Sequence, residues 1–161
     1  MDRPVKIAAF WPDDEAGIAR ARAIRVEVFV DEYGVIEELD ADPLDTAPNT
    51  VHLVAWDASG DLGTARVVAD ADRDDVVHFT RVAVRAEARV RGVGRALMHR
   101  CEEVALAVGR RRGLDRVTAD LSVMDHAADF YRAAGYTVGA EAYIQVRIPH
   151  RRAHKLLGAV T

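Results

Sequence analysis

The chain has 161 residues, half of them apolar, which suits one folded domain and argues against a disordered protein. A net charge of −4 argues against nucleic acid as the main partner, and no apolar run reaches the ~18 residues of a membrane span. The single cysteine, Cys101, and an N-terminal stretch without the apolar core of a signal peptide favour a cytoplasmic location.

The first third of the chain is predicted to form a strand, a helix and a long connection. Residues 5–10 are an apolar run typical of a strand, and Pro12 followed by three acidic residues is typical of a helix start. Apolar residues at helical spacing extend this helix to about Phe29. Residues 31–49 then form an irregular, acidic segment with room for one short helix. Connections of this length inside a domain often carry function.

The rest of the chain is predicted to complete a sheet. Residues 52–56 and 63–69, separated by a turn, predict a hairpin. The elements that follow are a strand at 76–84, a long helix ending near Gly113, a strand at 116–122, a short helix at 124–135, and strands at 136–144 and 149–157. This order predicts an α+β fold, with a mostly antiparallel sheet and helices packed on its faces.

Charge is distributed unevenly along the sequence. Residues 27–75 hold fourteen acids and two bases, whereas residues 81–116 hold ten arginines and four acids. Such a pattern is typical of two solvated faces. It is also compatible with an anionic ligand on the basic side and a cationic ligand on the acidic side.

The predicted strand at 76–84 passes into the long helix through a turn that carries Gly92 and Gly94. The first backbone N–H groups of a helix lack an internal partner and form the positive end of its dipole. Glycine lets the main chain approach a bound anion closely, and nearby guanidinium groups add charge. The arginines of the turn are Arg89, Arg91 and Arg95. The turn is therefore either a pyrophosphate site or a tight turn with solvated arginines.

The wider spacing points to a family. Arg89-Val90-Arg91-Gly92-Val93-Gly94 fits Arg/Gln-x-x-Gly-x-Gly/Ala and resembles the acetyl-CoA-binding signature of the GNAT superfamily of N-acetyltransferases. Residues 127–136, "AADFYRAAGY", resemble the second signature of that superfamily. The segments "RVEVFVDE" and "IPH" further resemble the ElaA-like subgroup. The resemblance implies a single GNAT domain over residues 1–161, with about six to seven strands and about four helices.

The resemblance also implies acetyl-CoA as the cofactor and acetyl transfer to a primary amine as the reaction. The phosphates would lie on the turn, and pantetheine would lie along one strand as an added strand. The residues implied in cofactor binding are Val82, Ala83, Val84, Arg89, Val90, Arg91, Gly92, Val93, Gly94 and Arg95. Tyr131 matches the family tyrosine that protonates the leaving thiolate. Two positions depart from the family pattern: Val90 replaces a glycine, and Met124 replaces an Asn or Gln.

The general base is left open by the sequence. Glu32 and His150 lie in segments that resemble the subgroup, and we predict them as catalytic candidates beside Tyr131; Glu27, His52 and His78 are also compatible with this role. The residues predicted on the acceptor side are Glu27, His52, Arg66 and Arg81. The two arginines would bind an acceptor carboxylate or pair with acids of the long connection.

The acidic residues of 31–45 favour a cationic amine as acceptor, either a small molecule or a peptide. No metal is predicted, because His150 and His154 lack a third ligand. No nucleic-acid or membrane partner is expected, and a homodimer is expected from the family resemblance.

Two alternative functions remain open. The first is a binding module of the same fold that holds an acyl-CoA without turnover, which Met124 favours and Tyr131 disfavours. The second is an acyl-homoserine-lactone synthase, which shares the early Arg-x-x-Val-Phe segment but usually has a longer chain and further N-terminal signatures.

Overall fold

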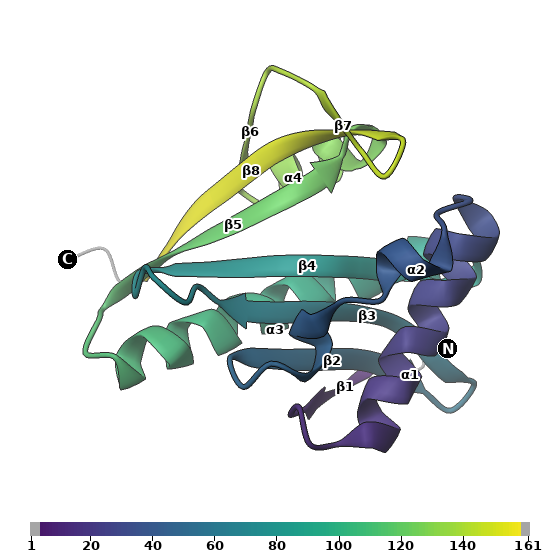
Figure 1. Cartoon of the computed structure of the whole chain (residues 1–161), viewed down its shortest axis with the longest axis horizontal. Coiled ribbons are helices and arrows are strands. Elements are labelled where there is room, and N and C mark those ends of the chain that lie inside the picture. The colour runs from purple at the N-terminus through teal and green to yellow at the C-terminus, as the bar shows by residue number, and fades with distance from the viewer. Residues whose placement is uncertain (1–3, 159–161) are drawn as a thin grey trace.

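One continuous sheet runs through the part of the chain that the computed structural model describes, residues 4–158 (Figure 1). Its eight strands follow the order β1-β2-β3-β4-β5-β8-β6, and β7 pairs with β8. β4 and β5 are parallel, and all the other strand pairs of the described residues are antiparallel. The predicted α+β fold with a mixed, mostly antiparallel sheet is therefore confirmed.

The strands are β1 (Lys6–Phe10), β2 (Thr50–Asp57), β3 (Gly60–Ala69), β4 (Val76–Val84), β5 (Arg116–Met124), β6 (Thr137–Val138), β7 (Tyr143–Gln145) and β8 (Ile148–Gly158). The α-helices are α1 (Glu15–Arg25), α2 (Glu37–Asp40), α3 (Val93–Arg111) and α4 (Ala128–Ala133). Helix α1 lies on one face of the sheet, whereas α3 and α4 lie on the other (Figure 1). None of the helices in residues 4–158 combines the length and the apolar composition needed to cross a lipid bilayer.

Helix α1 begins where the sequence predicts it. The side chain of Asp14 caps the helix by accepting a hydrogen bond from the backbone N–H of Gly17 at 2.9 Å. The α-helix ends at Arg25 and continues as a π-helical turn over Val26–Glu32, so the predicted helix to Phe29 changes its hydrogen-bond pattern before its end. The residue that follows this turn, Tyr33, lies beside β4.

Both faces of the central strands are buried, which explains their continuous apolar runs. Leu53 and Ala55 of β2 point toward α3 and pack in one cluster with Leu97. Val54 points the opposite way and packs with Ile24 of α1 in a second cluster. All five side chains are fully buried. The period of two along a strand thus places alternate residues in two separate cores.

The structure divides the predicted strand at 136–144 into two short strands. Residues 137–138 form β6, residues 143–145 form β7, and the residues between them leave the sheet. A two-residue turn joins β7 to β8, and its residues Val146 and Arg147 both have positive φ, 47° and 67°. Tight hairpin turns of this type require positive φ at both positions, which Asn and Gly adopt far more easily than a β-branched residue.

Buried ion pairs connect the acidic segment to the sheet. Arg25 of α1 and Arg66 of β3 are 1% and 2% exposed, and each donates to Asp45 Oδ1 at 2.8 Å. Arg25 also donates to Asp40, and Arg66 donates to Asp42 at 3.1 Å. We call these five residues the arginine–aspartate network.

The network favours the ionised form of Asp42 and Asp45 by lowering the pKa of each carboxyl group. Burial opposes ionisation of Asp45, but hydrogen bonds and charge from Arg25 and Arg66 outweigh it and lower the pKa to about 2. Arg81 of β4 extends the network through ion pairs with Asp40 at 3.3 Å and Asp42 at 3.5 Å. The acidic segment is therefore held against α1, β3 and β4 by ion pairs that are buried at Asp40 and Asp45 and partly exposed at Asp42.

Removing Asp45 should destabilise the fold strongly, because Arg25 and Arg66 would remain buried without this partner. For Asp45→Ala we expect the free energy of unfolding in urea to fall by about 3–5 kcal/mol. Asp61→Ala is the control, since it removes a partly exposed ion pair with Arg20 and should cost less than about 1 kcal/mol.

At low pH, the free energies of unfolding of the wild type and of Asp45→Ala should become more similar. A carboxylate with a lowered pKa contributes its full stability above its ordinary pKa of 3.8, and loses that contribution as the pH falls toward about 2. Equal losses for the Asp45 and Asp61 variants at neutral pH would contradict the stabilising role of the network.

Candidate active site

A cleft of about 920 Å³ opens where β4 and β5 separate. The two strands pair only through residues 76–78 of β4 and 118–120 of β5, and they diverge beyond that point (Figure 1). Residues 79–84 of β4 all line the cleft, and among residues 4–158 no strand pairs with the edge that they turn toward β5. Backbone N–H and C=O groups of this edge therefore face the cleft rather than a neighbouring strand, as at any free sheet edge.

A bulge bends β4 in the middle of this edge. Thr80 pairs with Arg66 and Ala83 pairs with Thr64, so Arg81 and Val82 together oppose a single residue of β3. Arg81 has a φ of 54°, which non-glycine residues seldom adopt. Bulges often redirect a strand and its side chains beside functional sites. In this bulge the residue with the strained backbone, Arg81, is part of the cleft wall.

The glycine turn forms one end of the cleft. Gly92 precedes α3 with a φ of 78°, a left-handed conformation that suits glycine. The N–H of Ala96 bonds to the carbonyl of Gly92, so the three N–H groups between them precede the first bond of the helix ladder. A Cβ on Gly94 would lie 3.3 Å from Phe130 Cζ. Glycine therefore lets the ring of Phe130 pack closely against the start of α3.

The residues around this turn divide into two groups. Those that line the cleft are Arg89, Val90, Gly92, Gly94 and Arg95. Arg91 instead pairs with Asp57 at 2.6 Å, and Val93 is fully buried in the core below α3. The side chains of Arg91 and Val93 therefore support the turn, and only their backbone groups remain available to a ligand.

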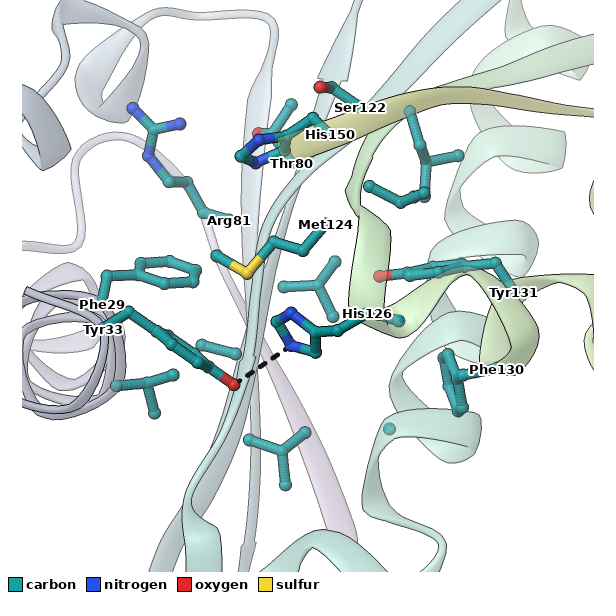
Figure 2. Close-up of a pocket in the computed structure, with 18 of the residues that line it drawn as sticks. Phe29, Tyr33, Thr80, Arg81, Ser122, Met124, His126, Phe130, Tyr131 and His150 are labelled. Atoms are coloured by element: carbon teal, nitrogen blue, oxygen red, sulfur yellow. Dashed lines mark hydrogen bonds between the residues drawn. The ribbon is translucent and has the colours of Figure 1, made fainter. Parts of the chain in front are cut away.

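Tyr131 of α4 points its hydroxyl group into the cleft (Figure 2). Edge-to-face contacts with Phe130 and Tyr136, at centroid distances of 5.0 and 5.9 Å, fix its ring. Burial raises the pKa of the Tyr131 phenol, so the group stays protonated near neutral pH. Its hydroxyl is thus a hydrogen-bond donor and a weak acid at the cleft.

His150 lines the cleft from β8 and is 6% exposed. Its Nδ1 lies 2.7 Å from the carbonyl oxygen of Ile148, and the ring stacks on Tyr143. A carbonyl oxygen only accepts hydrogen bonds, so Nδ1 must carry the proton. The neutral ring then has its lone pair on Nε2, which is the arrangement that a general base needs.

Three other candidate bases lie outside the cleft wall formed by the described residues. Glu32 binds both terminal nitrogens of Arg89, whose hydrogen bonds lower the pKa of its carboxyl group and make it a weaker base. Glu27 pairs with Arg85. His78 holds Asp120 at 3.0 Å and Asp70 at 2.7 Å, one on each ring nitrogen. All three have structural partners, and we do not retain Glu32 or Glu27 as site residues.

Two of the predicted acceptor-side residues are also internal. His52 is 1% exposed and its Nε2 lies 2.8 Å from the carbonyl oxygen of Asp45; burial lowers the pKa of its ring. Arg66 belongs to the arginine–aspartate network. Both side chains are buried and bonded to the acidic segment, which explains why neither reaches the cleft. Arg81 does line the cleft, with its guanidinium group paired to the network behind it.

Some cleft residues were not predicted from the sequence. Tyr33 follows the π-helical turn and His126 precedes α4, and they approach each other from opposite sides of β4 (Figure 2). Phe29 and Met124 add apolar surface between them. The available signal was their place beside the two segments that resemble the family, but nothing in the sequence pairs one with the other. Within residues 4–158, no three His, Cys, Asp or Glu side chains are arranged to hold a metal ion.

Comparisons with known proteins agree with this geometry. Residues 48–138 match the family model described as an acetyltransferase (GNAT) domain. A protein of Lactobacillus plantarum, provisionally named an N-acetyltransferase, is 30% identical, with a TM-score of 0.78 over 95% of this chain and 98% of that chain. An acyl-CoA N-acyltransferase of Pseudomonas aeruginosa is 26% identical, with a TM-score of 0.77 over 94% and 99%.

A third solved structure, ElaA of Escherichia coli, has a TM-score of 0.80 over 94% of this chain and 99% of that chain. Its identity is 21%, so this likeness shows a shared fold alone.

Proposed function

Because this chain belongs to the GNAT family of acyltransferases, we propose that it transfers an acetyl group from acetyl-CoA to a primary amine. The observation that carries the proposal is the free edge of β4, which runs through the cleft toward the N-terminus of α3. An extended chain of amide groups can pair with such an edge as an added strand. A diphosphate can accept hydrogen bonds from the N–H groups at the helix start.

Coenzyme A combines these two chemical features in one molecule. Its pantetheine arm would pair with Val82, Ala83 and Val84, and its phosphates would lie on the glycine turn near Arg89 and Arg95. The thioester would then lie at the bulged part of β4, where a backbone N–H can stabilise the developing oxyanion. A preorganised donor of this kind contributes about 3–4 kcal/mol in acyl transfer.

The chemistry requires two proton transfers. The amine nitrogen attacks the thioester carbonyl carbon, the C–S bond breaks, and the amide keeps the acetyl group. We assign removal of the amine proton to Nε2 of His150, and donation of a proton to the leaving sulfur to the hydroxyl of Tyr131. Both residues line the cleft, the contact of His150 Nδ1 with the Ile148 carbonyl leaves Nε2 to accept a proton, and burial keeps the Tyr131 phenol protonated.

Ion pairs weaken the charge argument for a cationic acceptor. Asp40, Asp42 and Asp45 are neutralised by arginines, and Glu32 is paired with Arg89. These acids therefore give no support for a cationic amine. The proposal is a primary amine of a small molecule or peptide, with the charge of the acceptor left open.

Other parts of the proposal rest on the sequence. We propose one acyltransferase domain over residues 1–161; a cytoplasmic location and a homodimer remain predictions.

An assay of thiol release over a panel of primary amines tests the reaction. Acetyl-CoA supplies the acyl group, and a thiol reagent detects free coenzyme A. Cys101 will not interfere, because it is fully buried and burial raises the pKa of its thiol. Binding of coenzyme A without turnover on any amine would favour the non-catalytic module instead. Absence of binding in calorimetry would contradict the proposal.

Replacing Gly92 should weaken coenzyme A binding without unfolding the chain. Gly92→Val forces a branched side chain into a left-handed conformation at the phosphate turn, and the loss of charge-assisted hydrogen bonds should raise the Kd about 10- to 100-fold. Gly113→Val is a matched control, because Gly113 follows α3 with the same φ of 78° and equally open surroundings. Calorimetry should show an unchanged Kd for this control. If both variants lost affinity equally, the glycine turn would not be part of the coenzyme A site.

Replacing His150 should slow the chemical step. For His150→Gln we expect kcat to fall about 10²-fold or more, with little change in the KM for acetyl-CoA, because the base acts on the amine. With acceptor amines of low pKa, which are already neutral in the assay, kcat should fall less. His99→Gln, on the exposed surface of α3, is the control. A pH–rate profile that is identical in wild type and His150→Gln would reject this role.

Replacing the hydroxyl of Tyr131 should lower kcat more than it raises the KM for acetyl-CoA. Tyr131→Phe keeps the ring contacts, so the melting temperature should change little while kcat falls about 10²-fold, the low end of general acid catalysis. Tyr143→Phe removes a hydroxyl that bonds to Ser122 and serves as control. If both variants kept full kcat, the leaving thiolate would need no proton from Tyr131.

A further inference from the structure

Two side chains meet across the cleft. Tyr33 comes from the end of the π-helical turn after α1, and His126 comes from the short turn between β5 and α4. The Tyr33 hydroxyl lies 3.4 Å from His126 Nε2, and the two ring centroids are 5.5 Å apart. Figure 2 shows the pair reaching toward each other in front of β4. We call this pair the Tyr33–His126 clasp.

Each side of the clasp is fixed by its own contacts. On the α1 side, the guanidinium group of Arg89 lies over the Tyr33 ring, 5.9 Å from its centroid. Arg89 is itself held by Glu32 and by the carbonyl oxygen of Val84 at 3.0 Å. Tyr33 is thus tied to the end of β4 beside the glycine turn.

On the opposite side, Asp125 forms an ion pair with Arg151 of β8. Arg151 also donates to the carbonyl oxygens of Gly139 at 3.1 Å and Ala140 at 2.6 Å. These contacts anchor the turn that carries His126. The Tyr33–His126 contact lies between the two anchored turns, and its 3.4 Å hydrogen bond can break without disturbing either anchor.

The position of the clasp divides the cleft. Tyr33 and His126 line the same cavity as residues 79–84 of β4, with the glycine turn at one end and His150 at the other. A ligand that extends along β4 from the turn toward His150 must therefore pass the clasp. Tyr33 is half-buried and His126 is exposed, so the contact is open to rearrangement.

We propose that Tyr33 and His126 close over the pantetheine arm of bound coenzyme A and retain it against β4. This inference rests on the proposed function, since it assigns positioning residues to that site. The clasp performs no proton transfer in this scheme. Its effect is on the residence time of the cofactor, because the hydrogen bond must break before the arm can leave sideways.

Stopped-flow measurement of coenzyme A dissociation tests the clasp. Tyr33→Phe and His126→Ala each remove one side of a hydrogen bond, and we expect each to speed dissociation roughly three- to tenfold. The double variant should be no faster than either single one, because both changes delete the same interaction. His126→Gln should restore slow dissociation, since the amide can still bond to the Tyr33 hydroxyl. Tyr143→Phe is the matched control.

Adenosine 3′,5′-bisphosphate separates the clasp from the phosphate turn. This probe carries phosphates but no pantetheine arm, so its dissociation should be equal in wild type and in all the clasp variants. Equal acceleration of both ligands would overturn the proposal, because Tyr33 would then act through Arg89 on the phosphate turn.

Two further results would also overturn the clasp. The first is release of coenzyme A from the variants at the wild-type rate. The second is tighter binding of coenzyme A by the variants, which would make the pair an obstacle in the cleft. Either outcome leaves coenzyme A binding intact and the proposed function standing. Wild-type protein that binds neither ligand would instead reject both proposals together.

Discussion

The cleft exists because β4 and β5 pair for only a short distance. Each strand keeps a partner on its other side, β3 for β4 and β8 for β5, so the separation leaves two free edges without dissolving the sheet. His78 closes the last paired rung by bridging Asp70 and Asp120. Beyond that rung the edge of β4 that faces β5 has no strand partner in the described chain, and the amides of a coenzyme A arm are of the kind that can pair with it.

Some of the charged residues of this protein form ion pairs in its interior. The acidic and basic blocks that stand apart in the sequence meet in the fold, where Arg81 pairs with Asp40 and Asp42, and Arg89 pairs with Glu32. The network stands directly behind Arg81, whose left-handed backbone forms part of the cleft wall. A bulge with this conformation persists only when its surroundings determine it. The buried ion pairs are the part of those surroundings that can hold Arg81 in place.

Local patterns predicted the parts of the site that local geometry decides. The glycine turn, the strand that leads into it and the helix carrying Tyr131 each show their character within about ten residues of sequence. Pairing across the fold was not predictable in this way. Glu32 looked like a free base, but its partner Arg89 lies 57 residues away, and Tyr33 and His126 are 93 residues apart. The side chain of His52 likewise met a backbone carbonyl that no periodicity reveals.

The turn between β7 and β8 combines an unfavourable backbone conformation with a place in the cleft wall. Val146 both lines the cleft and holds a backbone conformation that β-branched residues resist. Substitutions that change activity often lower the stability of the fold. Here an exchange for asparagine would relax the chain while it reshapes the entrance. Homologous enzymes could thus diverge in acceptor preference at this position while gaining, rather than losing, thermal tolerance.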